Sequence, residues 1–176
     1  MRNTKTLWIA RTAVLTALLL VLQFVTKPLG QLVTGSCVNA VLAVAALLGG
    51  LSSGLTVAVL SPIFAFLLGT GPQFFPLTPA IAAGNCVLVL LLWFICRDNF
   101  SVARRALACI TAAFGKFAAL YILIVKLICS FMPLADKQIA TFSAMFSWPQ
   151  LITALIGSAI ALVIVPRIGK FFPLSK

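Results

Sequence analysis

Apolar residues occupy long, nearly unbroken stretches of the chain, separated by short groups of Gly, Pro and charged residues. A bilayer core of about 30 Å needs about 20 helical residues, so stretches of about that length are candidate membrane spans. Six are present, and we expect helices over about residues 7–26, 32–48, 51–68, 80–96, 102–131 and 148–165. The pattern predicts an all-α integral membrane protein in which residues 1–176 form one six-transmembrane-helix bundle.

The breaks between these stretches differ in character. Residues 27–30 (KPLG) follow the first stretch, and the glycines at 49–50 separate the second from the third. The connection over 69–79 contains three prolines, which exclude a regular helix and predict an irregular loop. Residues 136–138 (DKQ) predict a polar loop before the sixth span.

The composition excludes a water-soluble globule. Hydrophobic residues make up 62% of the chain and charged residues 9%, whereas soluble domains average about 45–50% and about 25%. The 13 Lys and Arg residues outweigh 2 acids and give a net charge of +11. Apolar runs separate them too widely for a nucleic-acid surface, so we expect no nucleic-acid partner and interpret them as orientation signals.

The basic residues fall mostly at one set of helix ends. If the N-terminus is cytoplasmic, Lys27 and Lys137 lie outside, and Lys116 and Lys126 lie within the fifth span. The remaining bases lie at inner ends: Arg2, Lys5, Arg11, Arg97, Arg104, Arg105, Arg167, Lys170 and Lys176. Because cytoplasmic loops carry an excess of Lys and Arg, we expect both termini in the cytoplasm and a multi-pass location in the bacterial cell membrane. The first span starts like a signal peptide, but its apolar run is longer than a typical signal-peptide core and no clear A-x-A cleavage site follows, so we expect it to be retained.

The same counts exclude most enzyme chemistry. Asp98 and Asp136 are the only acids and lie 38 positions apart, which leaves no carboxylate pair and no acidic cluster for a metal ion. The chain has no His, and so no imidazole base and no HExxH zinc motif. None of its five Cys lies in a CxxC pair, and we interpret them as small apolar residues. We therefore expect no catalytic residue, no metal site and no cofactor.

Lys116 is the polar residue that most needs an explanation. It lies eleven residues beyond Arg105, which at about 1.5 Å per residue places it about 16 Å deep, near the membrane midplane. A lysine there costs about 2.5–3.5 kcal/mol on insertion scales. We interpret Lys116 as a functional residue. The alternative is a lysine bonded to backbone carbonyls, or one that reaches the interface from a shallower position.

Two amides fall in the same layer by the same count. Asn85 and Asn39 lie about 18 Å and about 16 Å from the inner edge. Gln23 could join them, although a Gln near a helix end often serves helix packing. With no acid in the membrane to balance Lys116, we expect a ligand carboxylate or phosphate to supply the missing charge, and the amides to orient that ligand.

The predicted outer side contributes further candidates for substrate contact. A loop that carries Phe74 and Phe75 between two prolines would cover an amphipathic ligand, although outer aromatics also form interfacial belts. Lys126 lies about 15 Å above Lys116, where a lysine reaches the headgroups or a ligand. The candidates on this side are Gln73, Phe74, Phe75, Tyr121, Lys126, Trp148 and Gln150.

With these residues in view, the whole chain resembles the S-component, the substrate-binding membrane subunit, of energy-coupling factor (ECF) vitamin transporters. The resemblance rests on size, topology and several loose motifs: the small-residue pair Ala13 and Ala17, the stretch from Asn39 to Leu51, Ser61-Pro62, Pro79 with Gly84-Asn85, and the isolated Lys116. It implies that the loops over 26–31 and 69–79 act as gates. It also implies docking through Ala10, Ala13 and Ala17 onto a transmembrane coupling subunit that carries two ABC ATPases.

The sequence therefore predicts the binding subunit of an ECF-type ABC importer for a small anionic vitamin or vitamin precursor. Carboxylates such as nicotinate, pantothenate or lipoate fit Lys116, and phosphorylated precursors are also compatible. The chain has no GxxxxGK[ST] phosphate loop, so ATP hydrolysis would lie in the partners. One alternative is a standalone secondary transporter of a small organic anion, which commonly needs titratable acids or histidines in the membrane. A small membrane enzyme is another, but no motif such as GxSxG supports it.

Overall fold

The computed structural model describes residues 4–96 and 101–169, and in these ranges the chain is helical apart from short connections. Six helical spans are long and apolar enough to cross a membrane, which confirms the predicted all-α membrane bundle. The elements in chain order are α1 (Thr4–Thr26), η1 (Lys27–Leu29), α2 (Gln31–Leu48), α3 (Gly50–Leu67), α4 (Leu77–Cys96), α5 (Val102–Leu120), η2 (Tyr121–Ile128), α6 (Cys129–Phe131), α7 (Asp136–Met145) and α8 (Trp148–Ile168).

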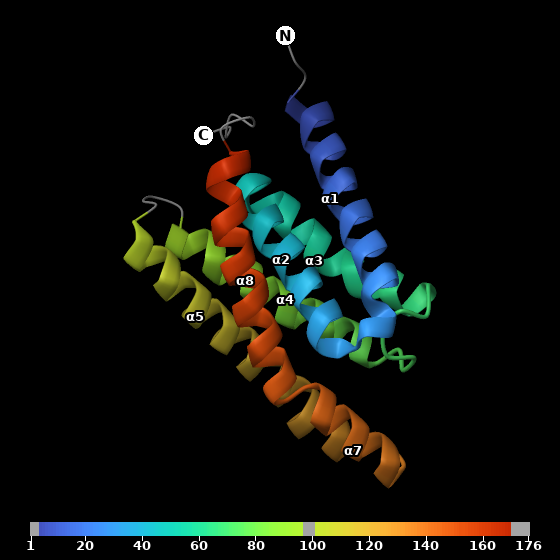
Figure 1. The fold of residues 1–176 in the computed structure, drawn as a ribbon. Coiled ribbons are helices and arrows are strands. Elements are labelled where there is room, and N and C mark those ends of the chain that lie inside the picture. The colour runs from blue at the N-terminus through green and yellow to red at the C-terminus, as the bar shows by residue number, and fades with distance from the viewer. Residues whose placement is uncertain (1–3, 97–100, 170–176) are drawn as a thin grey trace.

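The start of α1 and the end of α8 lie at the same end of the bundle (Figure 1), as an even number of spans requires. We call this the first end, and we call the opposite end, where η1 and α7 lie, the second end. The cytoplasmic location of the first end stays a prediction from the distribution of charges. Four of the basic residues predicted at this end lie outside the described residues, namely Arg2, Arg97, Lys170 and Lys176.

The predicted polar loop at 136–138 is wrong, because these residues begin α7. The side chain of Gln138 accepts a hydrogen bond from the backbone N–H of Ala135 at 3.2 Å, which stabilises the first turn. Phe142 is buried in a small apolar cluster with Leu120 and Ile124, so tertiary packing holds this polar helix against η2. As Figure 1 shows, α7 projects past the helices of the main bundle at the second end.

Two further features of the helices differ from the sequence pattern. The fourth helix begins at Leu77, three residues before its predicted start, because Pro79 lies in the first turn, where no helical N–H bond is lost. The fifth span covers the predicted 102–131, but residues 121–128 form a π-helix. Hydrophobic periodicity alone does not reveal such a change in helix type.

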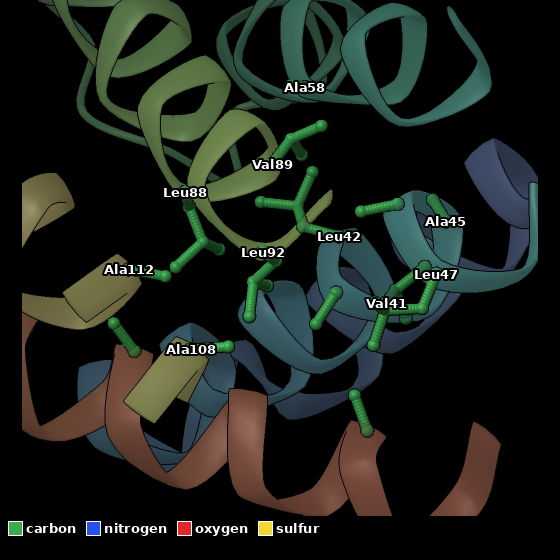
Figure 2. Packing of buried hydrophobic residues seen from close by; sticks show 14 of the residues in the cluster. Val41, Leu42, Ala45, Leu47, Ala58, Leu88, Val89, Leu92, Ala108 and Ala112 are labelled. Atoms are coloured by element: carbon green, nitrogen blue, oxygen red, sulfur yellow. The ribbon is translucent and has the colours of Figure 1, made fainter. Parts of the chain in front are cut away.

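The main apolar core lies between α2, α3, α4, α5 and α8. Leu42, Leu88 and Leu92 are fully buried and project into the centre of the bundle (Figure 2). Close helix approach depends on small residues: a Cβ added at Gly157 of α8 would lie 2.6 Å from Cβ of Asn39 and 2.6 Å from the backbone oxygen of Ser36, both on α2. Membrane helices associate through such small-residue contacts, because lipid gives no hydrophobic driving force between them.

The helix α1 lies at the edge of the bundle against α2 and α3 and turns a polar stripe inward. Thr12, Thr16, Gln23 and Thr26 are buried, and the Thr12 hydroxyl bonds the Ser53 hydroxyl at 2.7 Å. The opposite face is apolar and exposed, as expected for a helix that faces lipid. It includes the predicted docking residues Ala10, Ala13 and Ala17.

Gly157→Ala is expected to destabilise the bundle by about 1–3 kcal/mol, because the new methyl group meets Asn39 and α2 backbone that cannot move aside. Unfolding of the purified protein in detergent measures this change. Gly115→Ala is the matched control: its Cβ meets the end of the flexible Leu91 side chain, so a smaller loss is expected. Equal losses for the two variants would contradict the close-approach argument.

Candidate functional site

A cavity of about 320 Å³ lies between the helices in the half of the bundle near the second end. It is lined by residues between Gly30, the N-cap of α2, and Asn39, and by residues of α4 between Thr78 and Asn85. These residues belong to the halves of the two helices near the second end. Its lining residues are Gln23, Lys27, Gly30, Gln31, Thr34, Gly35, Val38, Asn39, Ser61, Pro62, Ala65, Phe66, Thr70, Gly71, Pro72, Thr78, Ile81, Asn85, Lys116, Met145, Phe146 and Gln150.

The deepest part of the cavity wall holds a lysine between two amides. The Lys116 ammonium donates hydrogen bonds to Asn39 Oδ1 at 2.6 Å and to Asn85 Oδ1 at 2.7 Å. All three side chains are buried, and Lys116 is only 3% exposed. The depth count placed these residues in one layer, and the structure brings them into direct contact.

Neighbouring helices fix the orientation of both amides. Asn39 Nδ2 donates to the Thr153 hydroxyl on α8 at 3.2 Å, and Asn85 Nδ2 donates to the backbone oxygen of Ala58 on α3 at 3.3 Å. That oxygen is available because Pro62, four residues later in α3, has no N–H to bond it. With the nitrogen atoms engaged in this way, both amide oxygens face the ammonium.

The charge on Lys116 is solvated but not neutralised. Amide oxygens carry dipoles and no net charge, so the two asparagines replace water around the ammonium without cancelling it. In the described part of the chain the only acid is Asp136, which is exposed at the start of α7 and does not line the cavity. An ammonium has three donors, and Asn39 and Asn85 take two of them. The site is therefore suited to an anion.

The other predicted loop contacts lie outside the cavity lining. Phe74 stacks on Phe142 at 5.8 Å between ring centroids, and Phe75 packs against Phe66 at 5.5 Å while remaining 65% exposed. Gln73 is exposed, and its Nε2 donates to the backbone oxygens of Phe66 in α3 and of Gly71 in its own loop. The same loop covers the cavity with smaller residues, namely Thr70, Gly71 and Pro72.

Tyr121, Lys126 and Trp148 also lie outside the cavity lining and line up along the outer surface. The Lys126 ammonium lies 5.7 Å from the Tyr121 ring centroid, and five-residue spacing brings side chains together in a π-helix. The Phe117 ring lies 5.8 Å from Tyr121 and 6.5 Å from Trp148. Gln150, by contrast, lines the cavity and donates to the Met145 backbone oxygen at 3.2 Å.

Several lining residues were not among the sequence candidates. Gln31 and Thr34 come from the first turns of α2, Ser61 from α3, and Met145 and Phe146 from the end of α7. Of these, Ser61 had the clearest signal, because it precedes a proline inside a membrane span. No feature of the sequence indicated Met145 and Phe146, since the hydrophobic pattern did not predict α7.

The comparisons with known proteins agree with the fold. A family model described as the substrate-specific component of ECF transporters matches residues 8–169. That range includes every cavity-lining residue and all six spans apart from the first residues of α1. Comparisons with curated proteins and with solved structures found no match.

Asn85→Leu is expected to destabilise the protein by about 1.5–3 kcal/mol, because Lys116 loses one of its two acceptors. In the double variant with Lys116→Met the buried charge is absent, so the added cost of Asn85→Leu should fall well below its cost alone. Unfolding of the four proteins of this double-mutant cycle in detergent gives the coupling. Additive losses would contradict a direct interaction.

Proposed function

The chain belongs to the family of ECF transporter substrate-specific components, and from this membership and the charge in its cavity we propose that it captures a small anionic vitamin or vitamin precursor. Family membership makes it a multi-pass, substrate-binding transporter subunit that works with ECF coupling and ATPase subunits. The identity and charge of the substrate and the bacterial cell membrane as its location are our proposals.

The observation that carries the anionic substrate is the unbalanced ammonium of Lys116. A carboxylate or phosphate that enters the cavity would accept a charge-assisted hydrogen bond, the stronger kind of polar contact. Because the surroundings exclude much of the water, the attraction between the two charges would be weakly screened. Asn39 and Asn85 would hold the lysine in place for this contact.

The position of the cavity supports capture from outside the cell, because it lies at the end opposite the predicted cytoplasmic termini. Two connections cover it there: η1, which follows α1, and the loop after α3. The Lys27 ammonium in η1 donates to the backbone oxygen of Gly69 in the second connection at 2.7 Å. We propose that these two connections act as gates and that this bond joins them when the cavity is closed.

The partner subunits would meet the chain at its membrane-facing surface. Ala10, Ala13 and Ala17 are exposed on α1, away from the cavity. Small residues at a spacing of four allow another helix to approach closely. We propose this surface as the contact with the coupling subunit, with ATP hydrolysis carried out by the two ATPases.

Lys116→Met is expected to weaken binding by about 10- to 150-fold, the range for a hydrogen bond to a charged group of about 1.5–3 kcal/mol. The molecule that copurifies with the protein, identified by mass spectrometry, serves as ligand for calorimetry. Lys137→Met is the matched control, since it removes an equal charge from the exposed surface of α7. Unchanged affinity in Lys116→Met would refute the proposed charge pairing.

A further inference from the structure

The cavity wall holds three buried polar side chains outside the Lys116 network: Gln23 on α1, Ser61 on α3 and Thr78 on α4. All three are more than nine-tenths buried, with exposures of 9%, 2% and 6%. Within residues 4–96 and 101–169, Gln23 Oε1 has no hydrogen-bond partner. Buried polar atoms are nearly always bonded, so an unbonded one beside a cavity needs an explanation.

Other polar residues on the same wall are bonded within the protein. The Thr34 hydroxyl donates to the Thr26 backbone oxygen at 2.8 Å, and Gln31 Nε2 donates to the Met145 backbone oxygen at 2.6 Å. Asn39 and Asn85 are engaged with Lys116. Gln23, Ser61 and Thr78 are therefore a particular subset of the lining, contributed by α1, α3 and α4, and the cavity is the space they share.

The chemistry of this subset differs from that of Lys116. A Gln amide and the hydroxyls of Ser and Thr are neutral, and each can both donate and accept a hydrogen bond. Groups of this kind are matched by hydroxyl, amide or ring N–H groups of a ligand. A hydrocarbon chain placed against them would leave all three buried without partners, which a binding site disfavours strongly.

Resting on the proposed function, we infer that the substrate is a carboxylate or phosphate whose remaining part carries hydroxyl or amide groups, and that Gln23, Ser61 and Thr78 recognise those groups. The anionic group binds at Lys116, and the neutral polar groups bind along the wall formed by α1, α3 and α4. Anions with a purely hydrocarbon remainder are rejected.

Ser158 on α8 provides a natural control. Its hydroxyl is fully buried and has no partner in the described part of the chain, but unlike Gln23 and Ser61 it does not line the cavity. Ser158→Ala therefore removes a comparable group without touching a ligand. It separates recognition from any general effect of an unbonded hydroxyl.

The test compares two carboxylate probes, pantothenate, which carries hydroxyl and amide groups, and lipoate, whose remainder lacks them. Calorimetry on the full chain in detergent should show at least about 100-fold tighter binding of pantothenate to the wild type. Gln23→Leu, Ser61→Ala and Thr78→Val should each weaken pantothenate binding about three- to tenfold, as expected for a neutral hydrogen bond. None of the three should weaken lipoate binding, because each removes a polar group that lipoate leaves without a partner. Ser158→Ala should change neither.

The other outcomes of this test distinguish failure of the inference about neutral polar groups from failure of the proposed function. Equal or tighter binding of lipoate, no binding of pantothenate, or three cavity variants that match Ser158→Ala would overturn the inference about neutral polar groups. In any of these cases, if whichever carboxylate binds the wild type loses affinity in Lys116→Met, the proposed pairing of Lys116 with an anion is retained. If Lys116→Met binds it as tightly as the wild type, the proposed function fails. Unfolding curves of the ligand-free variants exclude loss of fold as the cause.

Discussion

A lysine ammonium that is buried among apolar helices must find oxygen atoms to replace its water, and this requirement organises the bundle. Lys116 on α5 meets it with one amide from α2 and one from α4. Each amide is held in turn by a further helix, Asn39 by Thr153 on α8 and Asn85 by Ala58 on α3. Five of the six spans are thus joined through a single charge.

Two features of the backbone make this network fit. Pro62 leaves the Ala58 oxygen without its helical N–H, and Asn85 uses that oxygen. The defect that a proline makes in one helix therefore orients a side chain on another. Gly157 lets α8 lie close enough to α2 for Thr153 to reach Asn39. Neither position touches Lys116, yet both determine where its acceptors lie.

The sequence alone was sufficient to predict the length of each span and the depth of a residue along it, because both increase in proportion to the number of residues. Apolar length predicted the six spans, and rise per residue placed Lys116, Asn39 and Asn85 in one layer. Which way a side chain faces depends on helix rotation and on neighbouring elements, so the outer contacts were harder to predict. The π-helix of η2 and the packing of α7 against it through Phe142 leave no periodic signal in the sequence. For this reason the sequence did not reveal that residues such as Phe74 and Trp148 lie outside the cavity lining.

The choice of amides rather than a carboxylate beside Lys116 has a functional consequence. A protein carboxylate would form an ion pair with the lysine, and an arriving anion would then have to compete with it and leave a second charge unpaired. Asparagine oxygens stabilise the ammonium in the empty protein and leave its net charge intact. The attraction remains available to an anionic ligand, while the lysine is already held in position and loses little conformational freedom on binding. In the proposed function, a buried cation solvated only by neutral groups is thus stable within the fold and still able to gain binding energy from an anionic ligand.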